Sequence, residues 1–401
     1  MVDPDAEADA DPDAELTALA SDLVSIPTEN PPGEEAPAAE FVHEWFIEEG
    51  IDAALLDEPD PDRPQVGARI GEGSPRIVLN AHLDVVPAGD PEAWSVDPYG
   101  GVVRDGRLYG RGSADVKTGL AIAMLVARDL APAIESDELS GSLVVHAPMG
   151  EETADPGTLT LLERDYDGDL GIVLEPTDFR VATATKGLAV YRLVVGGEAT
   201  HASQPDEGTN AIDESRRVLD AIDAYGRELR AGTDSLCGTA LATVTEIEAG
   251  TDSNLAVVPD RAELVLDRRV PPDESITAVD DEVDELVADL AADGVDVDWT
   301  RIQAYEPSSI ADDHSLARTL RERSVTTVGD DREGDERRLG EPWGIEAATD
   351  ARNFVNDAEI PAVTWGPGKL EEAHTIDESI SLADAARGRT ILTVTLRELL
   401  A

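Results

Sequence analysis

The sequence predicts an α/β protein, with a central sheet flanked by helices and a smaller α+β domain inserted into it. Short β-branched runs bounded by glycine and proline alternate with longer stretches of helical spacing, which is the pattern of an open α/β sheet. Over about 185–300 the expected order becomes strand, helix, two strands, helix and strand, which fits a ferredoxin-like module. We therefore expect 1–184 and 303–401 to form one domain, and 185–302 to be the insertion.

The individual elements follow from hydrophobic spacing and from the breakers between them. The run Ile77–Leu79, for example, is short, apolar and bounded by Gly73, Ser74 and Pro75, so it reads as a buried strand. Helices are expected over 14–24, 36–49, 120–130, 210–228, 276–290, 315–323 and 381–400. Strands are expected over 51–56, 65–70, 77–79, 142–147, 171–174, 188–195, 241–248, 262–269 and 295–300.

The charge is strongly acidic and spread along the whole chain. The 401 residues carry a formal net charge of −55, and only three of the 31 basic residues are lysines, namely Lys117, Lys186 and Lys369. An acidic surface poor in lysine fits a salt-loaded cytoplasm, where carboxylate repulsion is screened, so we expect a halophilic protein. The same charge argues against nucleic acid and anionic membranes as partners.

The cysteine count and the absence of long apolar runs narrow the protein class further. The one cysteine, Cys237, excludes an intrachain disulfide framework and a thiolate zinc cluster. No run approaches the roughly 18 apolar residues of a membrane span, and residues 1–5 do not look like a secretory leader. We therefore expect a cytoplasmic protein.

Histidine and acidic residues follow three of the expected strands at the point where each strand ends. His82 and Asp84 follow 77–79, Glu151 and Glu152 follow 142–147, and Glu175 follows 171–174. Ligands of open α/β sheets bind at this edge, and adjacent carboxylates repel each other unless a cation or a shared proton intervenes. For His82 and Asp84 alone, half of a metal site and a buried structural pair are equally good interpretations.

Asp115 has two competing interpretations, whereas His146 has one. Asp115 precedes the helix expected over 120–130, so it is either a ligand or an ordinary helix N-cap. His146 lies inside a strand and is expected to be structural.

With these motifs in place, the chain resembles the zinc-dependent M20 family of amidohydrolases and exopeptidases. This family includes acetylornithine deacetylases, succinyl-diaminopimelate desuccinylases, aminoacylases and glutamate carboxypeptidases. The matching stretches occur in the family's order and cover nearly the whole chain after about Leu16. They are 81–87, 110–119, 150–152, 175–177, 186–187, 201–203, 210–212, 267–271, 349–352 and 366–374. The resemblance implies a zinc-peptidase-like catalytic domain with a mixed sheet, and an insertion that acts as a lid and a homodimer contact.

The resemblance also implies a site that holds two divalent metal ions bridged by Asp115. His82 and Glu175 complete one ion, and Glu152 and His374 complete the other. Imidazole and carboxylate ligands without sulfur suit Zn²⁺ and tolerate Co²⁺ or Mn²⁺.

Catalytic and substrate-binding roles come from the same resemblance. Glu151 is implied as the general base on the attacking water, Asp84 as the partner that orients His82, and His201 as the donor to the oxyanion. Arg269 and Arg352 match family arginines that bind a substrate carboxylate, although each could equally be a structural arginine. The resemblance also implies Asn254 as a substrate contact, although it lies five residues before Pro259 where the family often has a spacing of three.

Three functions remain open from the sequence. The first is removal of the acyl group from an N-acylated amino acid, as in the deacetylases and desuccinylases. The second is a dipeptidase or carboxypeptidase activity with the same site and a short peptide as substrate. The third is a non-catalytic, cation-binding acidic protein, which would have no need of a base at Glu151.

Overall fold

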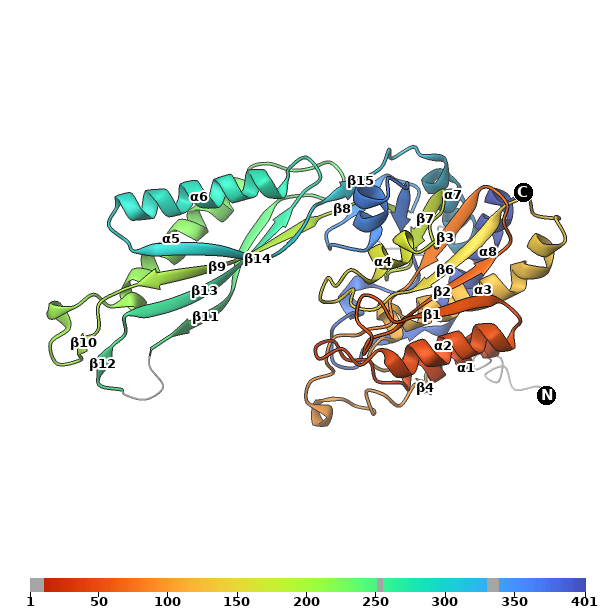
Figure 1. The fold of residues 1–401 in the computed structure, drawn as a ribbon, viewed down its shortest axis with the longest axis horizontal. Helices are drawn as coiled ribbons and strands as arrows, with labels where there is room; N and C mark the ends of the chain where they lie inside the picture. The colour runs from red at the N-terminus through yellow and green to blue at the C-terminus, as the bar shows by residue number, and fades with distance from the viewer. Residues whose placement is uncertain (1–10, 251–254, 330–338) are drawn as a thin grey trace, which may run out of the picture. The chain divides into compact units, whose positions relative to one another are not determined.

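The computed structural model describes residues 11–250, 255–329 and 339–401, and the chain divides into two compact units (Figure 1). The first unit runs to Thr183 and continues over Ile310–Trp343 and Thr349–Ala401. The second comprises Ala184–Ser309 and Gly344–Ala348. Its longer piece reaches beyond the expected end at 302, because the strand expected over 295–300 continues to Tyr305.

The first unit contains most of the helices. They are α1 (Ala14–Val24), α2 (Ala36–Glu48), α3 (Thr118–Glu135), α4 (Gly157–Glu163), α7 (Ser315–Val328) and α8 (Leu382–Leu399). Its strands are β1 (Asp52–Leu56), β2 (Gln65–Ile70), β3 (Arg76–Asn80), β4 (Val102–Arg104), β5 (Arg107–Tyr109), β6 (Ser142–Ala147), β7 (Leu170–Val173), β17 (Ala362–Thr364) and β18 (Ser379–Ser381). The strands β8 (Ala182–Thr185) and β16 (Trp343–Ile345) contain two of the four points where the chain passes between the units.

The large sheet is mixed, as expected. Its order is β1-β2-β6-β3-β7-β17-β8-β15, where β15 is Ser308–Ser309, and β16 pairs with β8. β6, β3, β7 and β17 are mutually parallel, whereas β1 and β2 run antiparallel to their neighbours. This arrangement confirms the α/β class with helices flanking a mixed sheet. It also brings the carboxyl ends of four parallel strands to one edge.

Both faces of this sheet are buried, which explains why its central strands are continuously apolar. Ile77 and Leu79 of β3 belong to the larger core, together with residues of α1, α2, α3, α7 and α8. The intervening Val78 belongs to the smaller core on the opposite face, with Leu162 of α4 and Phe354. Alternate residues of one strand therefore anchor helices on both sides.

The second unit is built around a four-stranded antiparallel sheet. Its order is β11-β13-β9-β14, formed by β9 (Gly187–Gly196), β11 (Leu241–Ala249), β13 (Arg261–Val270) and β14 (Val297–Tyr305). The helices α5 (Ala211–Leu229) and α6 (Ile276–Ala292) pack on one face (Figure 1), and β10 (Thr200–His201) pairs with β12 (Val257–Val258). With the short pair set aside, the chain order is β-α-β-β-α-β, that of a ferredoxin-like module.

None of the helices in the described parts of the chain is both long enough and apolar enough to span a membrane.

His146 is a buried neutral histidine, and it predicts a pH dependence of stability. It lies in β6, stacks on Phe354 with ring centroids 5.9 Å apart, and donates from Nε2 to the backbone oxygen of Tyr166 at 2.7 Å. Burial lowers the pKa of this imidazole to about 4, from an ordinary value of 6.5. The pKa of His146 is lower in the folded protein than in the unfolded chain. The contribution of neutral His146 to the free energy of unfolding is therefore fully present above pH 6.5 and is lost as the pH falls towards 4.

The expected size of this effect is about 3 kcal/mol in the free energy of unfolding. Denaturant unfolding of wild type and His146→Gln at pH 7.5 and pH 4.5 measures it, because other titrating groups are common to both proteins. The difference in stability between the two proteins should shrink at the lower pH. A difference that is the same at both pH values would contradict the assignment.

Candidate metal and catalytic centre

The carboxyl edge of the parallel strands carries most of the predicted site residues. His82 follows β3, Glu152 follows β6, and Glu175 follows β7. His374 lies in the connection from β17 to β18, and Asp115 lies in η2 (Ser113–Lys117), directly before α3. All five belong to the first unit, and the structure brings their side chains together.

Asp115 lies between two imidazoles, with a different oxygen facing each of them. Its Oδ1 is 3.4 Å from Nε2 of His82, and its Oδ2 is 3.3 Å from Nε2 of His374. Glu175 Oε1 lies 3.8 Å from the His82 nitrogen, and Glu152 Oε1 lies 3.1 Å from the His374 nitrogen. The residues thus form two groups of one imidazole and one glutamate, which share the Asp115 carboxylate.

The interpretation of Asp115 as a helix N-cap is wrong. Its φ and ψ are −126° and 89°, α3 begins only at Thr118, and the cap position of that helix is Lys117, which makes no side-chain capping bond. The Asp115 side chain is therefore not used by the helix.

The donor set fits divalent cations. One ligand atom each from His82, Asp115 and Glu152 lies within 4.8 Å of the others. Burial raises the pKa of Glu175 well above its ordinary value, and the Asp115 charge raises it further. Burial likewise raises the pKa of Glu152, although the hydrogen bond from His374 opposes this shift. Crowded carboxylates and imidazoles can release their protons and bind a divalent cation in their place.

The pKa shifts of His82, Asp115 and His374 come from their contacts with neighbouring charged groups, which outweigh burial. Burial opposes a charge on His82, but Asp115, Glu175 and Asp84 outweigh it and raise the pKa of the imidazole. Burial likewise opposes ionisation of Asp115, yet hydrogen bonds with both histidines lower the pKa of its carboxyl. Hydrogen bonds with Asp115 and Glu152 raise the pKa of His374 to about 10.

The orientation of His82 comes from the backbone of Asp84. Its Nδ1 lies 2.9 Å from the Asp84 carbonyl oxygen, which can only accept, so Nδ1 carries a proton and Nε2 is the ring nitrogen that faces Asp115. The Asp84 carboxylate is farther away, with Oδ1 3.6 Å from Nδ1. Asp84 therefore contacts His82 as expected, but it hydrogen-bonds the ring through its backbone.

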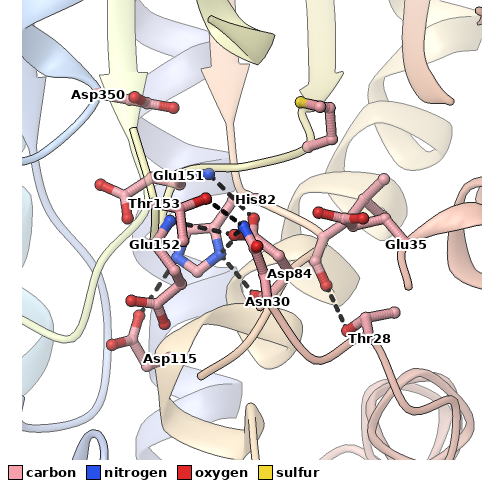
Figure 2. Close-up of polar contacts among 12 residues, drawn as sticks. Thr28, Asn30, Glu35, His82, Asp84, Asp115, Glu151, Glu152, Thr153 and Asp350 are labelled. Atoms are coloured by element: carbon pink, nitrogen blue, oxygen red, sulfur yellow. Dashed lines mark hydrogen bonds and ion pairs between the residues drawn. The ribbon is translucent and has the colours of Figure 1, made fainter. Parts of the chain in front are cut away.

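The Asp84 carboxylate instead holds the segment that carries the two glutamates. Oδ1 accepts from the backbone N–H of Glu151 at 3.1 Å, and Oδ2 accepts from that of Glu152 at 3.1 Å. Asn30 donates to the same Oδ2 at 2.9 Å and to Thr153 Oγ1 at 2.6 Å. Figure 2 shows Asp84 between this segment and Asn30, with the carboxylates of Glu151 and Glu152 pointing in different directions.

Glu151 is therefore free of the contacts that engage its neighbour. Glu152 bonds His374, whereas the Glu151 carboxylate is influenced by Asp350 and Arg352. Burial raises its pKa well above the ordinary value; His82 opposes this shift, and Asp350 adds to it. A carboxylate with a raised pKa accepts a proton readily, as a general base must. Arg352 is buried beside this site, with Nη2 3.5 Å from Asp350 Oδ1.

Three predicted residues belong to other parts of the chain. His201 lies on β10 in the second unit and is exposed. Arg269 lies on β13 and makes a two-pronged contact with Asp267, at 2.9 Å from Nε and 3.2 Å from Nη2. Asn254 lies outside the described residues.

The ring of His201 has a defined tautomer. The backbone N–H of Ser203 donates to Nδ1 at 3.1 Å, so Nδ1 must carry a lone pair. The proton of the neutral ring is then on Nε2, which is available as a hydrogen-bond donor.

Sequence reasoning missed Asn30 and Glu378. Asn30 precedes Pro31 and Pro32, between the helices expected over 14–24 and 36–49, and this sequence context indicates only a loop. Glu378 follows His374 by four residues and accepts hydrogen bonds from the backbone of Ala114 and Asp115. The only signal for Glu378 is its closeness in sequence to the stretch 366–374, whereas Asn30 lies near none of the matching stretches.

The chain is similar to known proteins over most of its length. Over 390 residues, the chain is 27% identical to a probable succinyl-diaminopimelate desuccinylase of Staphylococcus aureus (strain MSSA476), covering 90% of this chain and 92% of that protein. It is 28% identical over 409 residues to an N-formyl-4-amino-5-aminomethyl-2-methylpyrimidine deformylase of Halalkalibacterium halodurans, covering 94% and 93%. An M20 family metallo-carboxypeptidase from Sulfolobus solfataricus has the same fold, with a TM-score of 0.77, 18% identity and coverage of 96% and 98%.

A model of the family Peptidase M20/M25/M40 matches most of the chain. It matches residues 78–398, which contain every one of the site residues discussed above except Asn30. The chain therefore belongs to peptidase family M20/M25/M40.

Proposed function

We propose that the protein hydrolyses the amide bond of an N-acylated amino acid, releasing a carboxylic acid and a free amine, at a centre that holds two divalent ions. Members of the family are metallohydrolases of amide or peptide bonds, so the class of reaction follows from membership. The observation that carries the two-ion proposal is Asp115, whose two oxygens face the imidazoles of His82 and His374.

The proposed ligands are those expected from the sequence: His82 and Glu175 for one ion, Glu152 and His374 for the other, and Asp115 for both. Nitrogen and oxygen donors without sulfur favour Zn²⁺, with Co²⁺ or Mn²⁺ as substitutes. When bound, such ions lower the pKa of water and polarise the scissile carbonyl.

Residues of the chain supply the proton transfers. Glu151 takes a proton from the attacking water while the water oxygen forms a bond to the amide carbon. Glu151 then delivers this proton to the leaving nitrogen as the C–N bond breaks. Asp84 holds Glu151 in place through the backbone N–H. His201, protonated on Nε2, is the proposed donor to the carbonyl oxygen as negative charge develops there.

The acyl-amino-acid substrate is favoured by the similarity, over 90% of the chain, to a protein named as a probable succinyl-diaminopimelate desuccinylase. The deformylase is named for removing a formyl group from a pyrimidine amine, so it supports cleavage of an N-acyl amide and does not support an amino acid as the amine. A peptidase activity is the second candidate, because the neighbour in fold is named a carboxypeptidase. The scissile bond is an amide in both cases, so the ligand set does not separate them. Arg269 and Arg352 remain proposed contacts for a substrate carboxylate.

A substrate panel tests this proposal. The protein, loaded with Zn²⁺ or Co²⁺, is assayed against N-succinyl, N-acetyl and N-formyl amino acids and against di- and tripeptides, with a chelator-treated sample as the control. We expect turnover of acylated amino acids that is abolished by chelation. Turnover of peptides alone would overturn the deacylase assignment, and no turnover with metal bound would favour a cation-binding protein.

We also propose that the protein is adapted to high salt. Helix α6 carries six acidic residues and no basic residue, so its exposed side repels itself unless the solvent screens it. The denaturation midpoint should therefore rise from millimolar to molar KCl, and Asp281→Lys should reduce this dependence. Equal midpoints at both salt concentrations would contradict the proposal.

A homodimer formed through the second unit and a cytoplasmic location complete the proposal. Light scattering of the purified protein tests the oligomeric state, and a monomer at micromolar concentration would contradict it.

A further inference from the structure

Glu378 binds the segment that leads into the proposed shared ligand. Its side chain is fully buried, and its Oε1 accepts from the backbone N–H of Ala114 at 2.8 Å and of Asp115 at 3.1 Å. Its Oε2 accepts from Nη1 of Arg111 at 2.6 Å, and its backbone oxygen accepts from the N–H of Gly110 at 3.0 Å. One residue thus holds both ends of segment 110–115.

The geometry of this contact suits a carboxylate. Two successive N–H groups converge on a single oxygen, and a negatively charged acceptor makes such bonds about twice as strong as a neutral one. Arg111, whose side chain is also almost completely buried, balances the charge. A buried ion pair generally adds little to stability, because desolvation opposes its attraction. Its position next to Asp115 therefore calls for another explanation.

Glu378 also connects Asp115 to the opposite side of the centre. His374 lies one short turn before Glu378, and the following strand β18 pairs with β5, with Ile380 opposite Leu108. The same connection thus places an imidazole 3.3 Å from the Asp115 carboxylate and a carboxylate on the Asp115 amide. The Asp115 backbone N–H is therefore bound by Glu378, while the Asp115 side chain faces His374.

We propose that Glu378, with Arg111 as its counter-ion, is a positioning residue that fixes the backbone of Asp115 so that the two carboxylate oxygens face two separate ions. This inference rests on the proposed function, because it takes Asp115 as the shared ligand. Glu378 is not itself a ligand, since its two oxygens are occupied by Arg111 and by the backbone N–H groups.

The test is the metal affinity of Glu378→Gln, measured with Zn²⁺ in competition with a chromophoric chelator. Loss of a residue that orients a ligand typically lowers metal affinity 10–100-fold, and we expect about this loss for the weaker of the two ions. The Co²⁺-loaded variant should also show an altered visible absorption spectrum, because the ligand geometry around the ion changes. A purely structural role would change neither readout in a folded protein.

The matched control is Asp129→Asn, another carboxylate-to-amide change. Asp129 lies in α3 and contacts Arg128 and Arg389. This variant should bind Zn²⁺ as wild type does, even if its unfolding midpoint falls. Thermal unfolding of the metal-free proteins separates an effect on stability from an effect on the metal centre.

Wild-type Zn²⁺ affinity and Co²⁺ spectrum in folded Glu378→Gln would overturn the inference. If that variant does not fold, Glu378→Asp takes its place, because it keeps the charge but is too short to reach Arg111 and both N–H groups; unchanged affinity there is equally decisive. If the wild type binds Zn²⁺ and hydrolyses amides while the variants match it, this inference alone fails. If the wild type binds no Zn²⁺, the proposed function fails with it.

Discussion

Replacing Asp115 with alanine should release both metal ions and abolish most of the activity. The two oxygens of this carboxylate face different histidines, so one substitution removes a ligand from each ion. The loss of activity should exceed the roughly 100-fold that follows from losing a residue that only orients a ligand. Metal analysis of the dialysed variant, together with its rate of amide hydrolysis, measures both effects.

The fold should tolerate this change. In the wild type the Asp115 charge repels the neighbouring carboxylates and raises the pKa of Glu175. Removing Asp115 relieves this repulsion in the folded protein. Asp129→Ala in α3 is the control, because it removes an aspartate at a distance from the site, and it should keep both ions. An Asp115→Ala protein that retains two equivalents of metal would show that the carboxylate is not shared.

The second large effect is expected from Glu151→Gln. This variant should retain its metal ions while kcat falls about 10²–10⁴-fold, the usual contribution of a general base. Glutamine keeps the size of the side chain and the backbone hydrogen bond to Asp84, so only the capacity to accept a proton is lost. Steady-state kinetics with the metal content measured in parallel makes this comparison.

Glu151→Gln and Asp115→Ala should therefore fail in different ways. Glu151→Gln should bind metal without turning over substrate, whereas Asp115→Ala should bind little metal. Glu163→Gln, an exposed site in the nearby helix α4, controls for the change from carboxylate to amide. A full hydrolytic rate in Glu151→Gln would contradict the assignment of Glu151 as the general base. The residues around Glu152 would then be a site for metal ions only.

The regular elements were predictable because burial repeats along the chain. The helix over Ala14–Val24 and the strands over Gln65–Ile70 and Ser142–Ala147 occur with the expected bounds. The helix expected over 120–130 is longer, Thr118–Glu135, because it continues through Pro132. Very short strands, such as the three-residue β4 and β16, were not predicted, since three residues are too few to show a period.

The candidate site was predictable in part for a different reason. Parallel strands end at one edge of a sheet, so the residues following β3, β6 and β7 had to meet. Asp115 and His374 lie in connections that no strand direction constrains. For them the sequence offered only a resemblance, and the distances of 3.3–3.4 Å come from the structure.

The sequence by itself determined the class of fold, the family, and the residue types from which a metal centre can be built. These properties depend on local spacing and on motifs, which can be read along the chain. The tertiary structure alone decided which atom does what: that Asp84 orients His82 through a carbonyl while its carboxylate holds two glutamates, and that Glu378 grips the backbone of Asp115. These contacts of the Asp84 and Glu378 carboxylates join residues 67 to 263 positions apart, and the direction of every such hydrogen bond depends on where packing places each backbone group.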